Sequence, residues 1–425
     1  MINCCGSSCR NEKYKSQNNN SKINIDQINN ENKLLEKDNQ KDKFDSKDTP
    51  NGNHQERYEL YETPVNNKAM SNYGTIGLDN LGFCCYFNSA IQNLKNVYPF
   101  TFYVLKNYKS FNKSDFIYSY CKLIANLISQ SNYKYQSFEP REFFNHFHKL
   151  APNFNINEQN DSNICIFYIL SKLEKDTKKE GLPDPDIIDS LNEEEKVKFK
   201  DYIYKSYSNR NSYVLDYFFG FQQDIIECRN KDCNAINYLF QGFSVLNIPI
   251  VTLQGNQILK LEDALKYYEY KRLHKNKNGF NCSSCKESNI QTQTKIISYP
   301  KILIINFKRI GEKYFYDHNV QIPAKLNLDK YNYELIGFIM HIGGALSGHN
   351  IAICKNFFDN NWYEYDDSIV RKVDKLYKNE ESYLPDTKNG FLFFYKKQNV
   401  FDNIETQQQK NFIIRESAKV RKELI

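Results

Sequence analysis

Cys85 is well placed for nucleophilic chemistry, because it stands where a loop gives way to a predicted helix. Apolar residues recur at helical spacing over residues 86–94, and Gly77 and Gly82 interrupt the segment before them. Amide groups at the helix start and the positive end of the helix dipole would favour the thiolate of Cys85 over its thiol, whose ordinary pKa is about 8.5. A cysteine at a helix start is more often a packing residue, so the chemistry depends on a suitable base.

A candidate base and the acid that would orient it occur late in the chain. His349 follows a glycine-rich loop and precedes a strand pattern, and Asp366 ends a second, aromatic-rich strand pattern. Two antiparallel strands joined by a turn at residues 359–361 would place Asp366 beside His349. The carboxylate could then fix the tautomer of an imidazole that activates Cys85, and the adjacent Asp367 could assist or substitute. A surface hairpin without a catalytic role is the alternative.

These segments resemble the two signature boxes of the ubiquitin-specific proteases. The sequence GLDNLGFCCYFNSAIQNL resembles the cysteine box, and YELIGFIMHIGGALSGHNIAI with WYEYDD resembles the histidine box. The resemblance aligns Cys85 with the nucleophile, His349 with the base and Asp366 with the acid. It also places Asn80 on the family's oxyanion-hole residue, whose amide donates to the oxygen that becomes negative in the tetrahedral intermediate. For Asn80 an ordinary turn residue is the alternative.

The chain departs from the family pattern beside the predicted catalytic residues. Cys84 occupies the usual threonine place and Phe83 the usual asparagine place. We assign the chemistry to Cys85, because the Tyr-x-Asn-Ser that follows it fixes the register and a small thiol can replace threonine in packing. Asn350 stands where the family usually has a tyrosine after the base, so the packing around His349 is expected to differ.

A second departure lies at residues 159–165, QNDSNIC, in the place of the family's Gln-Gln-Asp-Ala-x-Glu-Phe box. Gln159 and Asp161 are retained, and the resemblance implies that this box contacts the basic C-terminal tail of ubiquitin. Ile164 replaces the glutamate and Cys165 the phenylalanine. One charge-assisted contact, typically about 1.5 to 3 kcal/mol, is therefore lost. Asp161 could equally serve as a helix N-cap.

Four cysteines form a metal-binding pattern. Cys228 and Cys233 lie in one short segment, and Cys282 and Cys285 lie in a second with the common two-residue spacing. Two such knuckles at the ends of β-ribbons would supply four thiolates to a structural Zn²⁺ ion, with no open position for substrate. The resemblance supports zinc, because many family members carry a zinc ribbon at this point of the chain. Separate cysteines are the alternative, and His274 is interpreted as a surface histidine rather than a ligand.

The resemblance implies an α+β, papain-like cysteine protease with a helical thumb, a sheet-rich palm and zinc-ribbon fingers at about residues 220–300. The predicted catalytic domain covers residues 74–397. Residues 1–73 contain too few apolar side chains to offset the entropy of ordering, so they are predicted to form a disordered polar tail. Residues 398–425 are predicted to form a polar, basic C-terminal tail with a short helix whose partner the sequence leaves open.

Composition argues against several classes of protein. The net charge of +6 is spread along the 425 residues instead of gathering with aromatic residues, which argues against nucleic-acid binding. The sequence shows no apolar run near 18 residues and no signal-peptide pattern, so we expect an intracellular protein of the cytoplasm or nucleus without a transmembrane segment. Its 12 cysteines are then thiols or metal ligands rather than disulfides. Cys4, Cys5 and Cys9 allow a weak lipid anchor.

Taken together, the resemblance implies a deubiquitinating thiol protease. Such an enzyme would hydrolyse the peptide or isopeptide bond after the C-terminal glycine of ubiquitin through a thioester intermediate, and its partners would be ubiquitin or ubiquitinated proteins. Two alternatives stay open. Ile164 and Asn350 favour a ubiquitin-binding scaffold with weakened catalysis, although the complete catalytic set opposes it. The altered acidic box also permits a protease for a ubiquitin-like modifier with a different tail.

Overall fold

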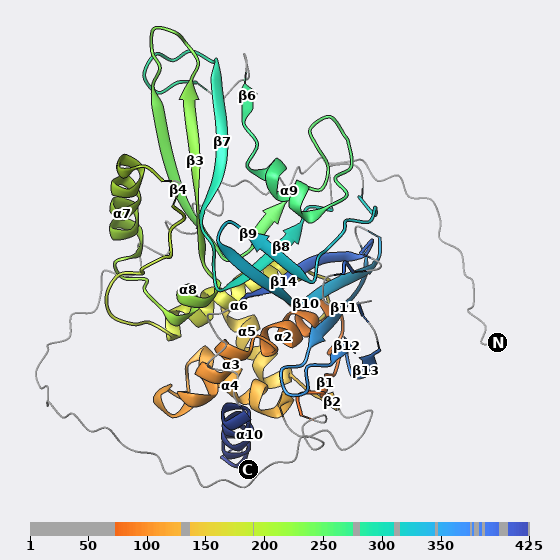
Figure 1. The fold of residues 1–425 in the computed structure, drawn as a ribbon. Coiled ribbons are helices and arrows are strands. Elements are labelled where there is room, and N and C mark those ends of the chain that lie inside the picture. Colours follow the sequence, from red (N-terminus) through yellow and green to blue (C-terminus); the bar gives the residue numbers. More distant parts are fainter. Residues whose placement is uncertain are drawn as a thin grey trace, which may run out of the picture. The chain divides into compact units, whose positions relative to one another are not determined.

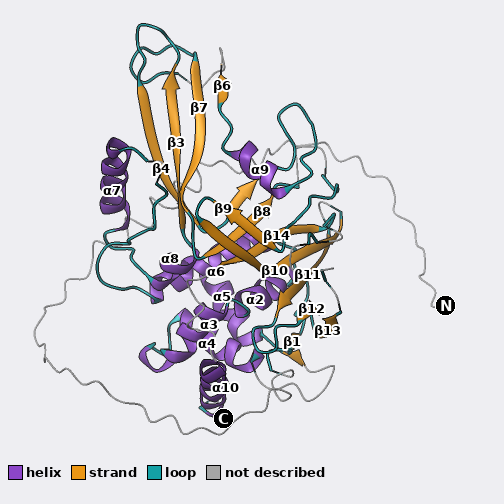
Figure 2. Cartoon of the chain, in the orientation of Figure 1, coloured by secondary structure: helices purple, strands orange, loops and turns teal. Residues whose placement is uncertain are grey.

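The computed structural model describes residues 73–423, with gaps at 129–136, 190, 275–280, 310–314, 345–346, 375, 378–381, 385–386 and 399–406. Cys4, Cys5 and Cys9 and almost all of the predicted N-terminal tail lie outside the described residues. In the described part, most helices and strands occupy separate regions, as an α+β fold requires (Figure 2). None of the helices described there combines the length and the apolar character needed to cross a bilayer.

The thumb consists of five helices: α2 (Cys85–Lys95), α3 (Tyr98–Lys106), α4 (Phe116–Leu127), α5 (Arg141–Leu150) and α6 (Ser162–Asp176). The short turn η3 (Tyr108–Ser110) follows α3, and β1 (Gly77–Leu78) pairs in parallel with β2 (Ser137–Phe138). Every residue of α2 is buried. This helix therefore forms the centre of the thumb, with Cys85 as its first residue.

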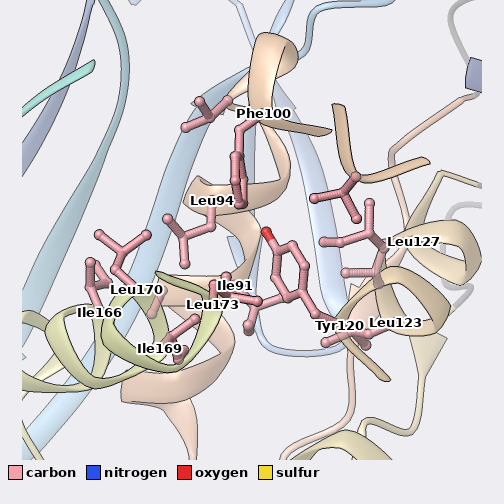
Figure 3. Close-up of a cluster of buried hydrophobic side chains, with 14 of the residues drawn as sticks. Ile91, Leu94, Phe100, Tyr120, Leu123, Leu127, Ile166, Ile169, Leu170 and Leu173 are labelled. Atoms are coloured by element: carbon pink, nitrogen blue, oxygen red, sulfur yellow. The ribbon is translucent and has the colours of Figure 1, made fainter. Parts of the chain in front are cut away.

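The core of the thumb is built from apolar side chains that recur at helical spacing. On α6, Ile166, Ile169, Leu170 and Leu173 are all fully buried and form one stripe. They meet side chains of α2, α3 and α4, among them Ile91, Leu94, Phe100 and Tyr120 (Figure 3). Full burial of one such apolar side chain stabilises a fold by about 1.5 to 3 kcal/mol. This packing holds the helix that begins with Cys85 in place.

The palm is an eight-stranded sheet in the order β13-β12-β11-β10-β14-β8-β5, with β9 paired to β10. Its strands are β5 (Leu246–Ile248), β8 (Ile302–Phe307), β9 (Lys325–Leu328), β10 (Tyr331–Gly343), β11 (Gly348–Lys355), β12 (Trp362–Asp366), β13 (Ile369–Val373) and β14 (Gly390–Lys397). Only the β5–β8 pair is parallel. Strand β8, between β14 and β5, is buried at every residue, as its continuous apolar run favours. Helix α9 (Leu261–Tyr268) packs against β5.

The fingers are a four-stranded sheet in the order β4-β3-β7-β6 that projects from the palm (Figure 1). The strands are β3 (Gly220–Cys228), β4 (Ile236–Phe243), β6 (Arg272–His274) and β7 (Ile290–Ser298). Helix α8 (Tyr213–Phe218) precedes β3, and α7 (Glu193–Tyr207) contacts β4. A capping box between Asn192 and Glu195 begins α7. The sheet lies within the region predicted for the fingers.

The C-terminal segment forms a final helix, α10 (Gln407–Lys422), which packs against α3 and α4 (Figure 1). The sequence predicts a helix here but leaves its partner open. The structure supplies the thumb as that partner, because Ile413 and Val420 of α10 belong to the thumb core.

Candidate active site

The loop before α2 is shaped by the side chain of Asn80. Its Oδ1 accepts hydrogen bonds from the backbone N–H groups of Gly82 (3.1 Å) and Cys84 (3.0 Å). Gly82 has a φ of +154°, and a Cβ there would lie 2.3 Å from the carbonyl oxygen of Ile156. Glycine is therefore required at this close approach. The loop delivers Cys85 to the first position of α2, as the sequence predicts.

The thiol of Cys85 is buried, with 5% of the residue exposed. Burial raises the pKa of this thiol, and the negative charge of Asp367 adds to the increase. The backbone amides of Asn350, Tyr86 and Cys85 itself act in the opposite direction but do not cancel it. The expectation that the helix start favours the thiolate is therefore wrong for this state, because desolvation outweighs the amide groups. The thiol needs a base to give up its proton.

The predicted base and acid meet in the β11–β12 hairpin. The two strands pair antiparallel, so His349 near the start of β11 lies beside Asp366 at the end of β12. His349 Nε2 lies 2.6 Å from Asp366 Oδ1. Since this contact uses Nε2, Nδ1 is the ring nitrogen available as a base. Helix α2 packs against β11, and the amide of Asn350, the residue after His349, contacts the Cys85 thiol.

Asp367 has hydrogen-bond partners of its own. Its Oδ2 accepts from Asn80 Nδ2 at 2.7 Å, and its Oδ1 accepts from Asn88 Nδ2 at 2.8 Å. Burial raises the pKa of the Asp367 carboxyl group, and these two amides lower it in part. The amide group of Asn80 carries two N–H bonds, so one is bound to Asp367 and the second can face a substrate. The sequence could not separate Asp367 from Asp366 in this way.

His341 is a residue of the site that sequence reasoning missed. It pairs with Asn350 across β10 and β11, and its Nδ1 lies 2.9 Å from Asn350 Oδ1. Its Nε2 lies 2.9 Å from the carbonyl oxygen of Gly344, in the loop before His349. Pairing β10 with β11 across the Gly343–Gly348 loop would have brought His341 and Asn350 together from sequence alone. Asn350 is 6% exposed and fills the place predicted to have altered packing.

The two residues predicted to bind substrate lie at the start of α6. The side-chain amide of Gln159 both donates to the Gly348 carbonyl (3.0 Å) and accepts from the Gly348 N–H (3.1 Å). Asp161 caps α6, because its Oδ1 accepts from the N–H of Asn163 at 2.7 Å. Asp161 is accessible to solvent, but crowding by protein atoms raises the pKa of its carboxyl group. Ile164 is 38% exposed on the same helix. Contacts with ubiquitin stay a prediction.

The four predicted metal ligands come together at the end of the fingers. One sulfur atom from each of Cys228, Cys233, Cys282 and Cys285 lies within 4.8 Å of the others. The Sγ atoms of Cys228 and Cys285 are 3.6 Å apart, and those of Cys233 and Cys282 are 3.7 Å apart. Disulfides need about 2.05 Å, whereas sulfurs about 2.3 Å from a tetrahedral Zn²⁺ stand about 3.8 Å apart. The set therefore fits one tetrahedral metal ion.

The surroundings of the cysteine cluster suit thiolate ligands. The N–H of Ser284 donates to Cys282 Sγ at 3.4 Å, and the amides of Cys285 and Ser284 lower the pKa of the Cys282 thiol to about 6. His274 stands apart from the cluster, with its Nε2 2.8 Å from Thr292 Oγ1. The prediction that it is not a ligand agrees with this position.

A comparison with family models decides the identity of the chain. The model for the ubiquitin carboxyl-terminal hydrolases matches residues 76–395. The chain belongs to this family. The matched range of the chain includes Cys85, His349 and Asp366 and all four clustered cysteines.

Curated relatives agree with the family assignment. Ubiquitin carboxyl-terminal hydrolase Usp2 of Drosophila melanogaster is 25% identical over 360 residues, which cover 79% of this chain and 36% of the relative. Probable ubiquitin carboxyl-terminal hydrolase 4 of Schizosaccharomyces pombe is 26% identical over 376 residues, which cover 80% of this chain and 62% of the relative. The chain therefore spans less than two thirds of either relative.

Solved structures show the same fold. A chain of the SAGA DUB module Ubp8/Sgf11/Sus1/Sgf73 bound to monoubiquitin matches this chain with a TM-score of 0.58 at 19% identity, over 80% of this chain and 72% of that chain. The module bound to ubiquitin aldehyde matches with a TM-score of 0.57 at 20% identity, over 77% and 70% of the two chains. The predicted α+β protease fold with thumb, palm and fingers is confirmed.

Proposed function

We propose that this chain is a deubiquitinating thiol protease that hydrolyses the peptide or isopeptide bond after the C-terminal glycine of ubiquitin. The 2.6 Å contact between His349 Nε2 and Asp366 Oδ1, on the strand pair that packs against the helix of Cys85, carries the proposal. An oriented base on a strand that packs against the helix of a buried thiol suits acyl transfer. The family assignment and the names of the relatives support ubiquitin as the modifier.

In the proposed mechanism, His349 Nδ1 takes the proton of Cys85 and the thiolate attacks the carbonyl carbon of the terminal glycine. The oxyanion of the tetrahedral intermediate accepts hydrogen bonds from Asn80 Nδ2 and from the backbone N–H of Cys85 at the start of α2. His349 then protonates the leaving amine, and a thioester remains on Cys85. Water that gives a proton to His349 attacks the thioester, which releases the ubiquitin carboxylate and restores the thiol.

Asp366 and the burial of the site have defined parts in this mechanism. Asp366 Oδ1 accepts from the Nε2–H of His349, so it fixes the tautomer and stabilises the imidazolium that forms. Because burial raises the pKa of the Cys85 thiol, the nucleophile forms by proton transfer to His349 and not by release of a proton to water.

The proposal includes a structural Zn²⁺ ion held by Cys228, Cys233, Cys282 and Cys285. The ion would join the ends of β3 and β7 and keep the fingers folded, and it takes no part in the chemistry at Cys85. The sulfur separations of 3.6 Å and 3.7 Å support this ligand set.

A ubiquitin probe that carries a C-terminal electrophile tests the function. We expect wild-type protein, loaded with zinc, to form a covalent adduct, Cys85→Ala to form none, and the matched variant Cys84→Ala to react like wild type. Cys84 is a suitable control because it is fully buried and burial raises the pKa of its thiol to about 12. If folded, zinc-loaded wild-type protein forms no adduct, the proposal is wrong.

A second candidate is a protease for a ubiquitin-like modifier with another tail. Ile164 and Phe167, one helical turn apart on α6, are 38% and 37% exposed. Apolar surface therefore stands where the family pattern places a carboxylate. Probes built on ubiquitin-like modifiers, run beside the ubiquitin probe, decide between the two: faster labelling by one of them would favour this candidate. Binding of ubiquitin without any adduct would instead indicate a scaffold.

A further inference from the structure

Helix α10 is joined to the thumb by apolar packing along one of its faces. Ile413 and Val420, seven residues apart, are 0% and 3% exposed and belong to the same core as the helix of Cys85. Ser417 lies between them and is also buried, so its small side chain sits within the contact. Phe412 packs against Phe102 of α3, with ring centroids 5.4 Å apart. The contact therefore resembles an internal helix pair rather than a loosely attached tail.

Polar contacts fix the helix at both ends. Near its start, the hydroxyl of Tyr98 on α3 donates to Gln409 Oε1 at 3.0 Å. Just beyond its end, the hydroxyl of Tyr108 in η3 donates to Glu423 Oε1 at 2.9 Å. These two bonds set the position of α10 along its axis, because each uses a different end of the helix.

The helix also reaches the palm. Lys410 Nζ donates to the carbonyl oxygen of Phe358 at 3.3 Å, in the turn that joins β11 to β12. The same turn is held by Phe357, whose ring lies 5.1 Å from that of Tyr98, and by Asn356, whose amide donates to the Tyr73 carbonyl at 2.8 Å. The β11–β12 hairpin carries both His349 and Asp366. Helix α10 thus contacts the thumb and the hairpin at once.

We propose that α10 is a brace that fixes the hairpin of His349 and Asp366 against the thumb helices that carry Cys85. The brace acts through two surfaces, the apolar face that binds α3 and α4 and the Lys410 contact with the turn of the hairpin. Its function is to keep His349 and Asp366 correctly positioned relative to Cys85. This inference rests on the proposed protease function.

The brace is tested by deleting α10 and then adding it back as a separate peptide. A chain that ends at Gln398 is compared with the full chain, using hydrolysis of a ubiquitin C-terminal amide reporter well below the thermal midpoint. We expect kcat to fall about tenfold or more with little change in KM, because the substrate-binding surface stays while the triad loses its register. A synthetic peptide of residues 407–423, added to the shortened chain, is expected to restore kcat.

Point variants keep the test decisive if the shortened chain does not fold. Ile413→Asp places a charge in the contact with the thumb and is expected to lower both kcat and the thermal midpoint, whereas Gln408→Asp, at an exposed position of the same helix, is expected to change neither. Lys410→Met keeps the apolar stem and removes the donor to Phe358. It is expected to lower kcat severalfold at an unchanged thermal midpoint.

The outcomes separate the brace from the proposed function. If the full chain fails to react with the ubiquitin probe, the protease proposal falls and the brace with it. If the full chain is active and Lys410→Met and the shortened chain keep full kcat, the brace alone is overturned. Loss of stability in Ile413→Asp with unchanged kcat in Lys410→Met would reduce α10 to a structural support, which also contradicts the brace.

Discussion

At the scale of single residues, two adjacent carboxylates face the same site with different partners. Asp366 Oδ1 contacts His349 at 2.6 Å, whereas Asp367 accepts from Asn80 and Asn88. Consecutive residues of a strand point to opposite sides. Asp367 escapes this rule because its φ of 50° ends the strand in a left-handed turn. One turn thereby orients both the base and the proposed oxyanion donor.

Loss of the Asp367 carboxylate is expected to damage the oxyanion hole. In Asp367→Ala the amide of Asn80 loses its 2.7 Å partner, and we expect kcat to fall about 10²-fold, the typical effect of losing one oxyanion donor, with KM little changed. Asp367→Asn keeps one acceptor oxygen and is expected to retain more activity. Steady-state hydrolysis of a ubiquitin C-terminal amide reporter measures both. Equal kcat in wild type and Asp367→Ala would show that Asn80 needs no such anchor.

At the scale of elements, local sequence patterns predict the hairpin that carries His349, but they do not predict contacts between distant segments of the chain. Two alternating strand patterns and a turn at residues 359–361 suffice to place His349 beside Asp366. The contact of Asn80 with Asp367 joins residues 287 positions apart, and that of Gln159 with Gly348 joins residues 189 apart. Each of these residues looks like an ordinary loop residue in its local sequence, so a single sequence does not indicate that the two members of either pair are in contact.

Helix α10 and the start of α2 show two further limits of sequence. The apolar spacing of α10 predicts a helix, but an apolar stripe does not show which surface it packs against. The thumb surface that contacts α10 is formed by two separate helices, α3 and α4. The helix-start argument for the Cys85 thiolate failed because burial, a tertiary property, outweighs the amides. By contrast, the four cysteines were predicted because ligand spacing is encoded locally.

Removal of the metal is expected to loosen the fingers and spare the palm. Cys228 ends β3 and pairs with Ile290 at the start of β7, so the proposed ion joins the two strand ends. Treatment with a strong chelator, or Cys282→Ser, should speed hydrogen exchange in β3 and β7 and slow labelling by the ubiquitin probe. Alkylation of Cys85 by a small electrophile should keep its rate. Protein purified without added metal should contain about one zinc per chain, and a metal-free protein with fully protected finger strands would contradict the assignment.

At the scale of the whole molecule, Lys95 joins the thumb, the palm and the segment before β1. It lies at the end of α2, is 1% exposed, and its Nζ donates to the Gly74 carbonyl at 2.6 Å and to Gln92 Oε1 at 2.9 Å. The hydroxyl of Tyr365, next to Asp366 on β12, lies 3.3 Å from the same nitrogen. Burial lowers the pKa of Lys95 to about 7. A buried charge therefore titrates near neutral pH, in contact with the residue that precedes the proposed triad acid Asp366.

The pH dependence of stability should report this buried lysine. An unfolded lysine keeps a pKa of about 10.4, so between pH 7 and about 10 the folded chain binds fewer protons than the unfolded chain. The free energy of unfolding should then rise with pH in this window, by up to about 1.4 kcal/mol per pH unit from this group. Lys95→Met removes this contribution. Urea unfolding at pH 6, 7.5 and 9 should therefore show that the free energy of unfolding of wild type, relative to that of the variant, increases with pH.

The matched control for this prediction is Lys106→Met, at an exposed position on α3. The stability of this variant relative to wild type should be the same at every pH, because it keeps the buried Lys95. Buried tyrosines whose pKa values are raised, such as Tyr333 and Tyr395, lower stability at high pH, so the comparison stops at pH 9. Parallel curves for wild type and Lys95→Met would mean that Lys95 stays charged, and that its three oxygen partners alone compensate a full charge at the junction of thumb and palm.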